Sequence, residues 1–340
     1  MMIFIWSIIL VTSLWVLVKA ADYFTDYAEK LGKLLHLSNF IIGVVIVAVG
    51  TSLPELATSI MGVRRGEVEM LSGNVIGTII ANLLLGLGLA VLFTRKKAVF
   101  NWDIVSNDFP FFAGAIFLLA VTLMDGKFTF VEAILFLVGY VLYLLYAFFI
   151  QKEESAVTRQ EFRKELKKEV ETGIEETQKR EKKAGFLATM ISENTKTILV
   201  LIVSLGIVSF ASYYVVEAVI NMAVLLGFGA SVLAATVVAV GTSLPEILIA
   251  ISAARRGNFD LALGDIFGSN IFDIFVIYGV AGLMTTLTIS PALFSTLIIF
   301  LIGTFILLWL VLIDKKITKT EATLFLIIYL FFIGKMFLLF

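Results

Sequence analysis

The 340-residue sequence contains no cysteine, and only 16% of its residues are charged. Without cysteine the chain can form neither a disulfide nor a thiolate metal site, and thiol redox chemistry is excluded. The charged fraction lies well below the roughly 25% that is typical of soluble domains. The chain has 26 lysines and arginines against 27 aspartates and glutamates. It therefore has no excess of basic residues that would indicate a nucleic-acid partner. The sequence also lacks a nucleophile–base pair, a zinc motif and a nucleotide-binding loop, and we expect neither an enzyme nor a resident cofactor.

Hydrophobic residues are abundant instead, at 60% of the chain, and they predict an all-α polytopic membrane protein. The first apolar run lacks the positive segment of a signal peptide, so we interpret it as a transmembrane helix that continues as an amphipathic stretch. The single histidine, His36, follows that stretch and is expected at the membrane interface. Runs of spanning length predict ten transmembrane helices, near 2–19, 39–63, 70–94, 108–124, 128–150, 196–222, 230–254, 260–285, 290–313 and 318–339.

Residues 151–195 differ from the rest of the chain because they are dense in both signs of charge and in helix-forming residues. Charge pairs four residues apart favour a solvated helix here. A regulatory calcium-binding domain would need acidic loops of the D-x-D-x-D-G type, and the sequence has none. We therefore divide the chain into a first five-helix half (1–150), a charged linker (151–195) and a second five-helix half (196–340).

Five spans precede the linker and five follow it, so the second half enters the membrane from the opposite side. The halves are predicted to be inverted repeats, a common design among transporters. Basic residues concentrate on the cytoplasmic side of membrane proteins. If both termini lie outside, only four of the 26 basic residues remain on the outer side, namely Arg64, Arg65, Lys127 and Lys335. This distribution predicts outer termini and a cytoplasmic linker.

One phrase, VAVGTSLPE, is written twice, at residues 47–55 and 238–246, an offset of 191. At this offset, 16 of the 36 positions from Val47 to Asn82 are identical without a gap. Each copy carries one carboxylate, Glu55 or Glu246, inside an apolar stretch. An ionisable group in the membrane is costly and indicates function. Two of them in matching positions predict a binding site on the symmetry axis of a cation transporter.

The repeated phrase gathers oxygen ligands around a proline. Pro54 removes a helical hydrogen bond and should free the carbonyl of Gly50, while Thr51 shares a helical face with Glu55. The second copy repeats this arrangement around Glu246. Oxygen ligands suit calcium and also sodium. Two adjacent carboxylates would repel unless one bound a proton or a divalent cation lay between them. The alternative is a pair of kinked helices whose buried glutamates are hydrogen-bonded as acids.

A second pair of segments, GNVIGTIIAN (73–82) and GDIFGSNIFD (264–273), adds polar groups to the predicted site. Glycines four apart allow close helix approach. Asp265 and its counterpart Asn74 lie nearer the helix ends, where interfacial or supporting roles are expected. The polar side chains on one face are Thr78 and Asn82 in the first half and Ser269 and Asp273 in the second, so Asp273 is a third carboxylate without an acidic counterpart.

These motifs, GTSLPE with GNxIGxxxxN and GTSLPE with GDxxGSNxxD, resemble the two alpha repeats of the calcium/cation antiporter superfamily. They are most similar to the sodium/calcium exchanger branch, including its prokaryotic members. The proton/calcium branch typically carries GNxxE where this chain has GTSLPE. The resemblance implies four central helices, near 39–94 and 230–285, across which the first and sixth spans slide. It also implies exchange of sodium for calcium by alternating access at one midplane site.

The resemblance further implies ligands for the transported ions, and one monomer would suffice. Calcium would be held by Glu55 and Glu246 with the carbonyls of Thr51 and Thr242. The implied sodium ligands are the same glutamates with Ser52, Ser243, Thr78, Ser269, Asn82, Asp273 and the carbonyls of Ala48 and Ala239. Thr78 stands where the family usually has serine.

Three alternatives stay open. An acid at the position of Asp273 accompanies potassium dependence in some members of the family and not in others. A potassium- or proton-coupled calcium exchanger is therefore the second hypothesis, although we favour sodium alone. A cation channel would also use buried carboxylates, but inverted halves disfavour it. The expected location is a prokaryotic cell membrane, with the lipid bilayer as the only partner besides the ions.

Overall fold

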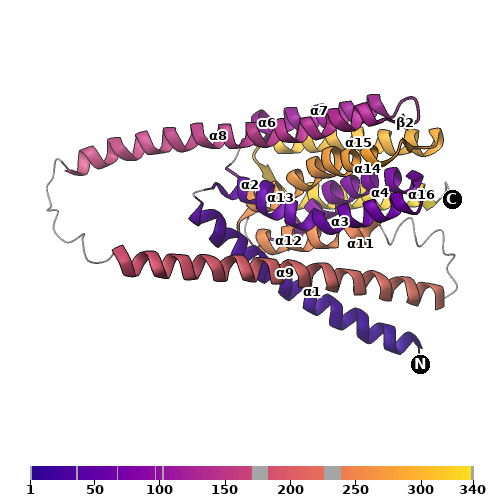
Figure 1. The fold of residues 1–340 in the computed structure, drawn as a ribbon, viewed down its shortest axis with the longest axis horizontal. Helices are drawn as coiled ribbons and strands as arrows, with labels where there is room; N and C mark the ends of the chain where they lie inside the picture. The colour runs from indigo at the N-terminus through magenta and orange to yellow at the C-terminus, as the bar shows by residue number, and fades with distance from the viewer. Residues whose placement is uncertain are drawn as a thin grey trace.

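The computed structural model describes residues 2–35, 37–66, 68–95, 97–101, 103–170, 183–225 and 239–337, and it is almost entirely helical (Figure 1). His36 lies outside the described residues. The first half comprises α1 (Met2–Leu34), α2 (Asn39–Ile41), the π-helix η1 (Ile42–Val47), α3 (Ala48–Arg64), α4 (Val68–Ala81), the π-helix η2 (Asn82–Gly86), α5 (Leu87–Phe93), α6 (Ile104–Asn107), α7 (Phe109–Thr122) and α8 (Phe130–Val170). The second half comprises α9 (Lys183–Leu225), α11 (Ala239–Thr242), α12 (Leu244–Arg255), α13 (Phe259–Phe272), the π-helix η4 (Asp273–Ile277), α14 (Tyr278–Met284), α15 (Pro291–Leu312) and α16 (Lys319–Phe337).

The described helices fall on all ten predicted spans, although the span at 230–254 is described only from Ala239 onward. Within the described residues, 7 helical segments are long and apolar enough to cross a membrane, and α7 is a shorter apolar helix. The first helix does continue past its apolar run, to Leu34, as its amphipathic spacing predicted. The chain is thus a ten-helix membrane protein.

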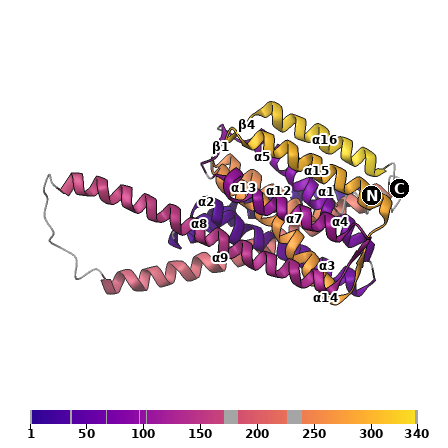
Figure 2. The ribbon, with the colours of Figure 1, turned by 90° about the horizontal axis from the view of Figure 1, so that it is seen from above.

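α8 and α9 run beyond the bundle at one end, where the linker lies, and both chain termini lie at the opposite end (Figures 1 and 2). We call these the linker end and the terminal end. The helical part of the linker, from 151 to Val170 in α8 and from Lys183 in α9, agrees with the predicted helix. Residues 171–182 of the linker lie outside the described part of the chain.

Four short strands show how the two halves are related. β1 (Ala98–Val99) pairs with β4 (Lys316–Ile317), and β2 (Lys127–Phe128) pairs with β3 (Leu287–Thr288). The repeat offset of 191 carries residues 98 and 127 to 289 and 318, two residues past the starts of β3 and β4. Each strand therefore pairs with the non-equivalent strand of the other half, as a two-fold relation requires. With five spans in each half, this pairing makes the repeats inverted.

The core lies between the repeated segments. The segments Leu71–Phe93 and Phe259–Met284 are largely buried, whereas the apolar part of α1 is mostly exposed, as expected for a lipid-facing helix. α13 packs directly on η1, where two glycines let the backbones touch. A Cβ added at Gly264 would lie 2.2 Å from the carbonyl oxygen of Phe40, and one at Gly43 would lie 2.5 Å from that of Leu261. This crossing fixes the helices that carry the polar motifs.

We predict that Gly264→Ala lowers stability, because the new methyl group would meet backbone rather than a flexible side chain. Overpacking of this kind costs about 1–3 kcal/mol. The matched control is Gly303→Ala in α15, where an added Cβ meets nothing within 4 Å. Thermal unfolding of the two purified variants in detergent should show a lower apparent Tm for Gly264→Ala only. Equal melting of both variants would contradict the close crossing.

Candidate cation site

α3 carries the first copy of the repeated phrase as one continuous helix. Pro54 lies inside this helix and cannot donate to the carbonyl of Gly50, as predicted. The helix nevertheless continues through Pro54 to Arg64, and the π-helix η1 precedes it. The Thr51 hydroxyl donates to the carbonyls of Val47 at 3.2 Å and Ala48 at 3.1 Å. The Ala48 carbonyl therefore already has one donor.

The second copy of the phrase has a different backbone. α11 ends at Thr242, and α12 begins at Leu244, so the helix is interrupted at Ser243. Pro245 then stands in the first turn of α12, where a missing N–H costs nothing. Glu246 is in the same turn, where the positive end of the helix dipole stabilises a carboxylate. The two copies therefore differ in backbone: among the described residues only the second copy interrupts its helix, while each copy keeps its proline four residues after its glycine.

The central helices bring the predicted polar side chains together. The Thr78 hydroxyl donates to Oε1 of Glu55 at 3.0 Å and lies 3.4 Å from the Thr242 hydroxyl. The Ser52 hydroxyl faces Oε1 of Glu246 across the two halves at 3.5 Å. Both glutamates are buried, with 2% and 1% of their surfaces exposed. Each glutamate therefore contacts a hydroxyl from another segment. Glu55 contacts Thr78 of its own half, and Glu246 contacts Ser52 of the other half.

The site holds several acceptor oxygens for which the described residues supply no hydrogen-bond donor. Among the described residues, Oε2 of Glu55, Oε2 of Glu246 and both carboxylate oxygens of Asp273 are buried without a hydrogen-bond partner. The amide oxygen of Asn82 and the hydroxyl of Ser269 are also without a partner. Buried polar groups are nearly always satisfied, and an unsatisfied one costs about 1–3 kcal/mol. A desolvated cation would satisfy this set of hard oxygen ligands.

None of the three described π-helices was predicted from the sequence, and two of them begin at predicted site residues. η2 begins at Asn82 and η4 begins at Asp273, which are equivalent positions in the two halves. Single-turn π-helices often mark functional sites in membrane and soluble helices. The Asn82 amide donates to Oδ1 of Asn270 at 3.2 Å, so Asn270 joins the polar cluster. Its counterpart in the first half is Ile79, and reasoning from matched positions therefore passed over it.

Asp265 is more deeply placed than the sequence indicated. Its position near a helix end suggested an interfacial or supporting role. Instead its side chain has no exposed surface, and neither carboxylate oxygen has a hydrogen-bond partner. The close crossing of α13 on η1 at Gly43 and Gly264 encloses it. The interfacial assignment was wrong, whereas its counterpart Asn74 is only partly buried.

Two further predicted ligands lie on the second copy of the repeated phrase. Ser243 is buried at the interruption between α11 and α12, and Ala239 begins α11. No three aspartate, glutamate or histidine side chains of the described part of the chain converge closely enough to hold a metal by themselves. Any cation here must therefore be bound by carboxylates together with hydroxyl, amide and carbonyl oxygens.

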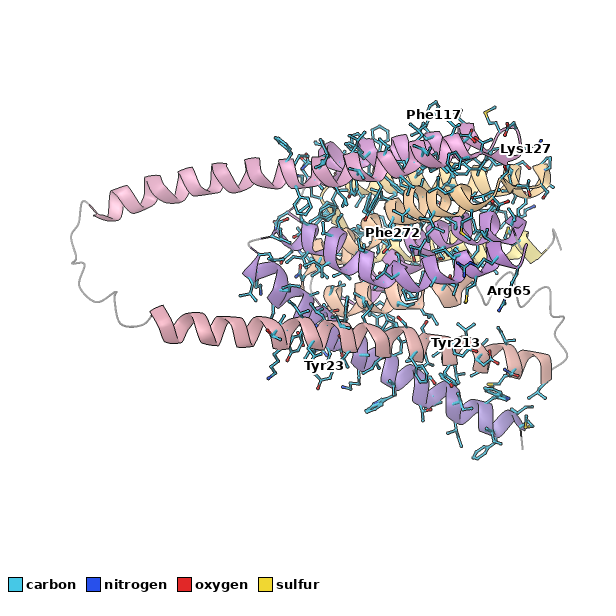
Figure 3. The ribbon with its side chains drawn as sticks, in the orientation of Figure 1. Tyr23, Arg65, Phe117, Lys127, Tyr213 and Phe272 are labelled. Carbon is cyan, nitrogen blue, oxygen red and sulfur yellow. The ribbon has the colours of Figure 1, made fainter. Side chains whose placement is uncertain are left out.

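A cavity of about 210 Å³ reaches this cluster from between α3 and α9. Glu55, Thr58 and Thr242 line it, together with Ser209 and Tyr213 of α9. Thr58 follows Glu55 along α3 toward Arg65, which lies at the terminal end of the bundle (Figure 3). The cavity therefore lies on the terminal side of Glu55.

The sequence profile of the sodium/calcium exchanger protein family matches residues 5–149 and 196–338. The sodium/calcium exchanger MaX1 of Methanosarcina acetivorans is 31% identical over an alignment of 366 positions, which covers 97% of this chain and 98% of the relative. The structure of the sodium-calcium exchanger NCX_Mj soaked with 10 mM Na⁺ superposes with a TM-score of 0.75 at 26% identity, over 98% of this chain and 99% of that chain.

A shorter match joins the chain to human sodium/potassium/calcium exchanger 4, at 29% identity over 142 residues, or 39% of this chain and 23% of the human protein. The profile matches in both halves and the relative at 31% identity spans nearly the full length. The resemblance found in the repeated motifs is confirmed, and the chain belongs to the sodium/calcium exchanger protein family.

Proposed function

We propose that this protein exchanges sodium for calcium across a membrane at a single site shared by both ions. The observation that carries the proposal is the pair of buried glutamates, one from each inverted half, each with a carboxylate oxygen that no donor among the described residues satisfies. A divalent cation between Glu55 and Glu246 would neutralise both charges. Membership of the exchanger family and the likeness to NCX_Mj and MaX1 support sodium and calcium as the ions.

Calcium is assigned to the carboxylates of Glu55 and Glu246 with the carbonyls of Thr51 and Thr242. Sodium ions are assigned to the same glutamates together with hydroxyl, amide, carboxylate and carbonyl oxygens around them. These further ligands are Ser52, Ser243, Thr78, Ser269, Asn82, Asp273 and the carbonyls of Ala48 and Ala239. The contacts of Ser52 with Glu246 and of Thr78 with Glu55 support this sharing, because they join the hydroxyls to the carboxylates that calcium would use.

Exchange without leak follows from the charge of the site. Uncompensated carboxylates in a low-dielectric interior carry a large desolvation penalty. A protein with an empty site should therefore change its access slowly, while one loaded with calcium or with sodium should change it readily. The cavity beside Glu55 supplies access from the terminal end, and the linker end would gain access in the alternate state.

Glu55→Gln and Glu246→Gln are each predicted to reduce calcium transport by about 30-fold or more, because the loss of one charge from a buried pair costs 2–5 kcal/mol of affinity. Uptake of calcium-45 into sodium-loaded proteoliposomes measures this effect. The matched control is Glu132→Gln, which removes a charge at a capping position outside the site, where Oε2 accepts from the Thr129 N–H at 2.6 Å. Wild-type uptake by either site variant, in protein that remains folded, would refute the shared site.

Orientation is proposed from charge, with the terminal end outside a prokaryotic cell membrane and the linker in the cytoplasm. Only four of the 26 basic residues lie on the outer side in this arrangement. The termini at one end of the bundle and the linker at the other agree with an odd number of spans in each half (Figure 1).

The native chain has no cysteine, so introduced cysteines report orientation without background. Lys127→Cys lies in the β2 turn at the terminal end, and Ser155→Cys lies in the linker helix. A membrane-impermeant thiol reagent applied to intact cells should label position 127 and spare position 155 until the membrane is permeabilised. Labelling in the reverse pattern would place the linker outside.

A potassium-coupled exchanger is the second candidate. It is favoured by the buried, unpartnered carboxylate of Asp273 and by the partial match to human sodium/potassium/calcium exchanger 4. We favour sodium coupling because calcium with two glutamates already balances charge, which leaves Asp273 without a required cation. Its counterpart Asn82 shows that the first half manages with a neutral amide at this position.

Asp273→Asn is predicted to keep sodium-driven calcium exchange and lose only part of its rate, since the change makes the two halves alike at this position. The measurement is calcium uptake into sodium-loaded proteoliposomes with and without added potassium. If wild-type exchange requires potassium and Asp273→Asn removes that requirement, the potassium-coupled candidate replaces the sodium-only one.

A further inference from the structure

An ion-pair cluster at the linker end holds α1 against the core. Arg256, at the C-terminus of α12, donates through Nη2 to the carbonyl of Asp22 at 2.8 Å, and the same nitrogen lies 3.7 Å from Oδ1 of Asp22. Its Nη1 contacts the carboxylate of Asp26. The Ser252 hydroxyl donates to Oδ1 of Asp22 at 2.7 Å. The Arg256 and Asp22 side chains are only 31% and 34% exposed, so these interactions are partly shielded from water.

The first half carries the counterparts of this pair. The repeat offset of 191 relates Arg256 to Arg65 and Asp26 to Glu217, so both charges are repeated at the terminal end. The two arginines occupy the same backbone turn: Arg65 caps α3 with φ −87° and ψ −4°, and Arg256 caps α12 with φ −80° and ψ −7°. Each is followed by a glycine with positive φ, 80° at Gly66 and 81° at Gly257.

The repeated charges are nevertheless used differently at the two ends. Arg65 is exposed and forms no ion pair with any acidic side chain that the structure describes. Glu217 instead accepts from the Asn221 amide on its own helix at 3.1 Å. Asp22 has Tyr213 as its counterpart, and this residue lines the cavity that reaches Glu55. Within the described residues, the terminal end thus lacks the counterpart ion pairs and holds the cavity that reaches Glu55.

Among the described residues, the ion-pair cluster and the cavity that reaches Glu55 therefore lie at opposite ends of the bundle. At the linker end α1 is fixed to α12 by the Arg256 cluster. At the terminal end α9 stands off from α3, with the cavity between them. Arg65 lies at that end, opposite Tyr23, the neighbour of Asp22 (Figure 3). In a protein built from inverted repeats, exchanging the conformations of the two halves converts this state into one that is open at the linker end.

We propose that Arg256 and Arg65 are positioning residues that act as alternate latches on α1 and α9. Arg256 holds α1 through Asp22 and Asp26 and keeps the linker end closed. When access changes, this pairing is released, and Arg65 pairs with Glu217 to hold α9 and close the terminal end. The inference rests on the proposed exchange function only in requiring two access states, and it can be tested without measuring transport.

The test uses two reporter cysteines at equivalent positions, introduced one at a time into the cysteine-free chain. Ser209→Cys lines the cavity at the terminal end, and Val18→Cys is its counterpart on α1, 191 residues earlier. Labelling rates with a hydrophilic thiol reagent, in protein purified in detergent, report the openness of each end. Latch variants are Arg256→Gln, Arg65→Gln and the double variant. Their neighbours Arg255→Gln and Arg64→Gln are the matched controls, because both side chains are exposed and form no ion pair among the described residues.

Arg256→Gln should shift the equilibrium between the two open states by roughly tenfold toward the linker end, as the loss of a partly shielded charged hydrogen bond implies. Labelling of Val18→Cys then rises and labelling of Ser209→Cys falls. Arg65→Gln should move both rates in the opposite direction, and the double variant should return toward the parent. Arg256→Lys keeps the positive charge and should therefore shift both labelling rates less than Arg256→Gln does. This difference separates the latch from a merely structural role.

Two results would overturn the latches. One is a change of both reporters in the same direction in both single variants, which indicates general loosening. The other is a change no larger than that of Arg255→Gln and Arg64→Gln.

Discussion

The constraint on which the structure depends is the charge of carboxylates that the protein buries and does not compensate. Glu55, Glu246 and Asp273 lie in the centre of a membrane bundle with oxygens that no described donor satisfies. Charged carboxylates in this arrangement are unfavourable for the protein alone, and a bound cation or proton relieves their repulsion. The close crossing at Gly43 and Gly264, the buried central helices and the hydroxyls of Ser52 and Thr78 hold these oxygens in place against their own repulsion.

Inverted symmetry allows the site to be reached from either side of the membrane. The two halves nevertheless differ in backbone and in side chains at the site. The strands pair as a two-fold relation requires, and the glutamates come from equivalent positions. The helix that carries Glu246 is interrupted at Ser243, whereas the helix that carries Glu55 is continuous. The counterparts of Asp273 and Asp265 in the first half are asparagines. The described state is also asymmetric, since the cavity that reaches Glu55 lies at the terminal end and the ion pairs of Arg256 hold α1 at the linker end.

Much of this could be predicted from the sequence because a membrane limits the choices. Apolar runs predicted the spans, and their count of five in each half predicted that the halves are inverted. The duplicated phrase predicted Glu55 and Glu246 as the central acids. Three features escaped prediction because they depend on packing between segments far apart in the chain. The π-helices at Asn82 and Asp273 adjust a helix to its neighbours and leave no local signal. Asp265 is buried at the crossing near Gly264. Asn270 was not predicted because its counterpart in the first half is the apolar Ile79.

The central claim is that sodium and calcium compete for the same oxygens. Calorimetric titration of the purified protein with calcium, over a series of sodium concentrations at constant ionic strength, tests it most directly. Shared ligands predict that sodium raises the apparent Kd for calcium, because sodium must leave these oxygens before calcium binds. Choline, which cannot enter the oxygen cluster, should have no such effect. A calcium Kd that is independent of sodium would contradict the account, because it would mean that the two ions occupy separate sites.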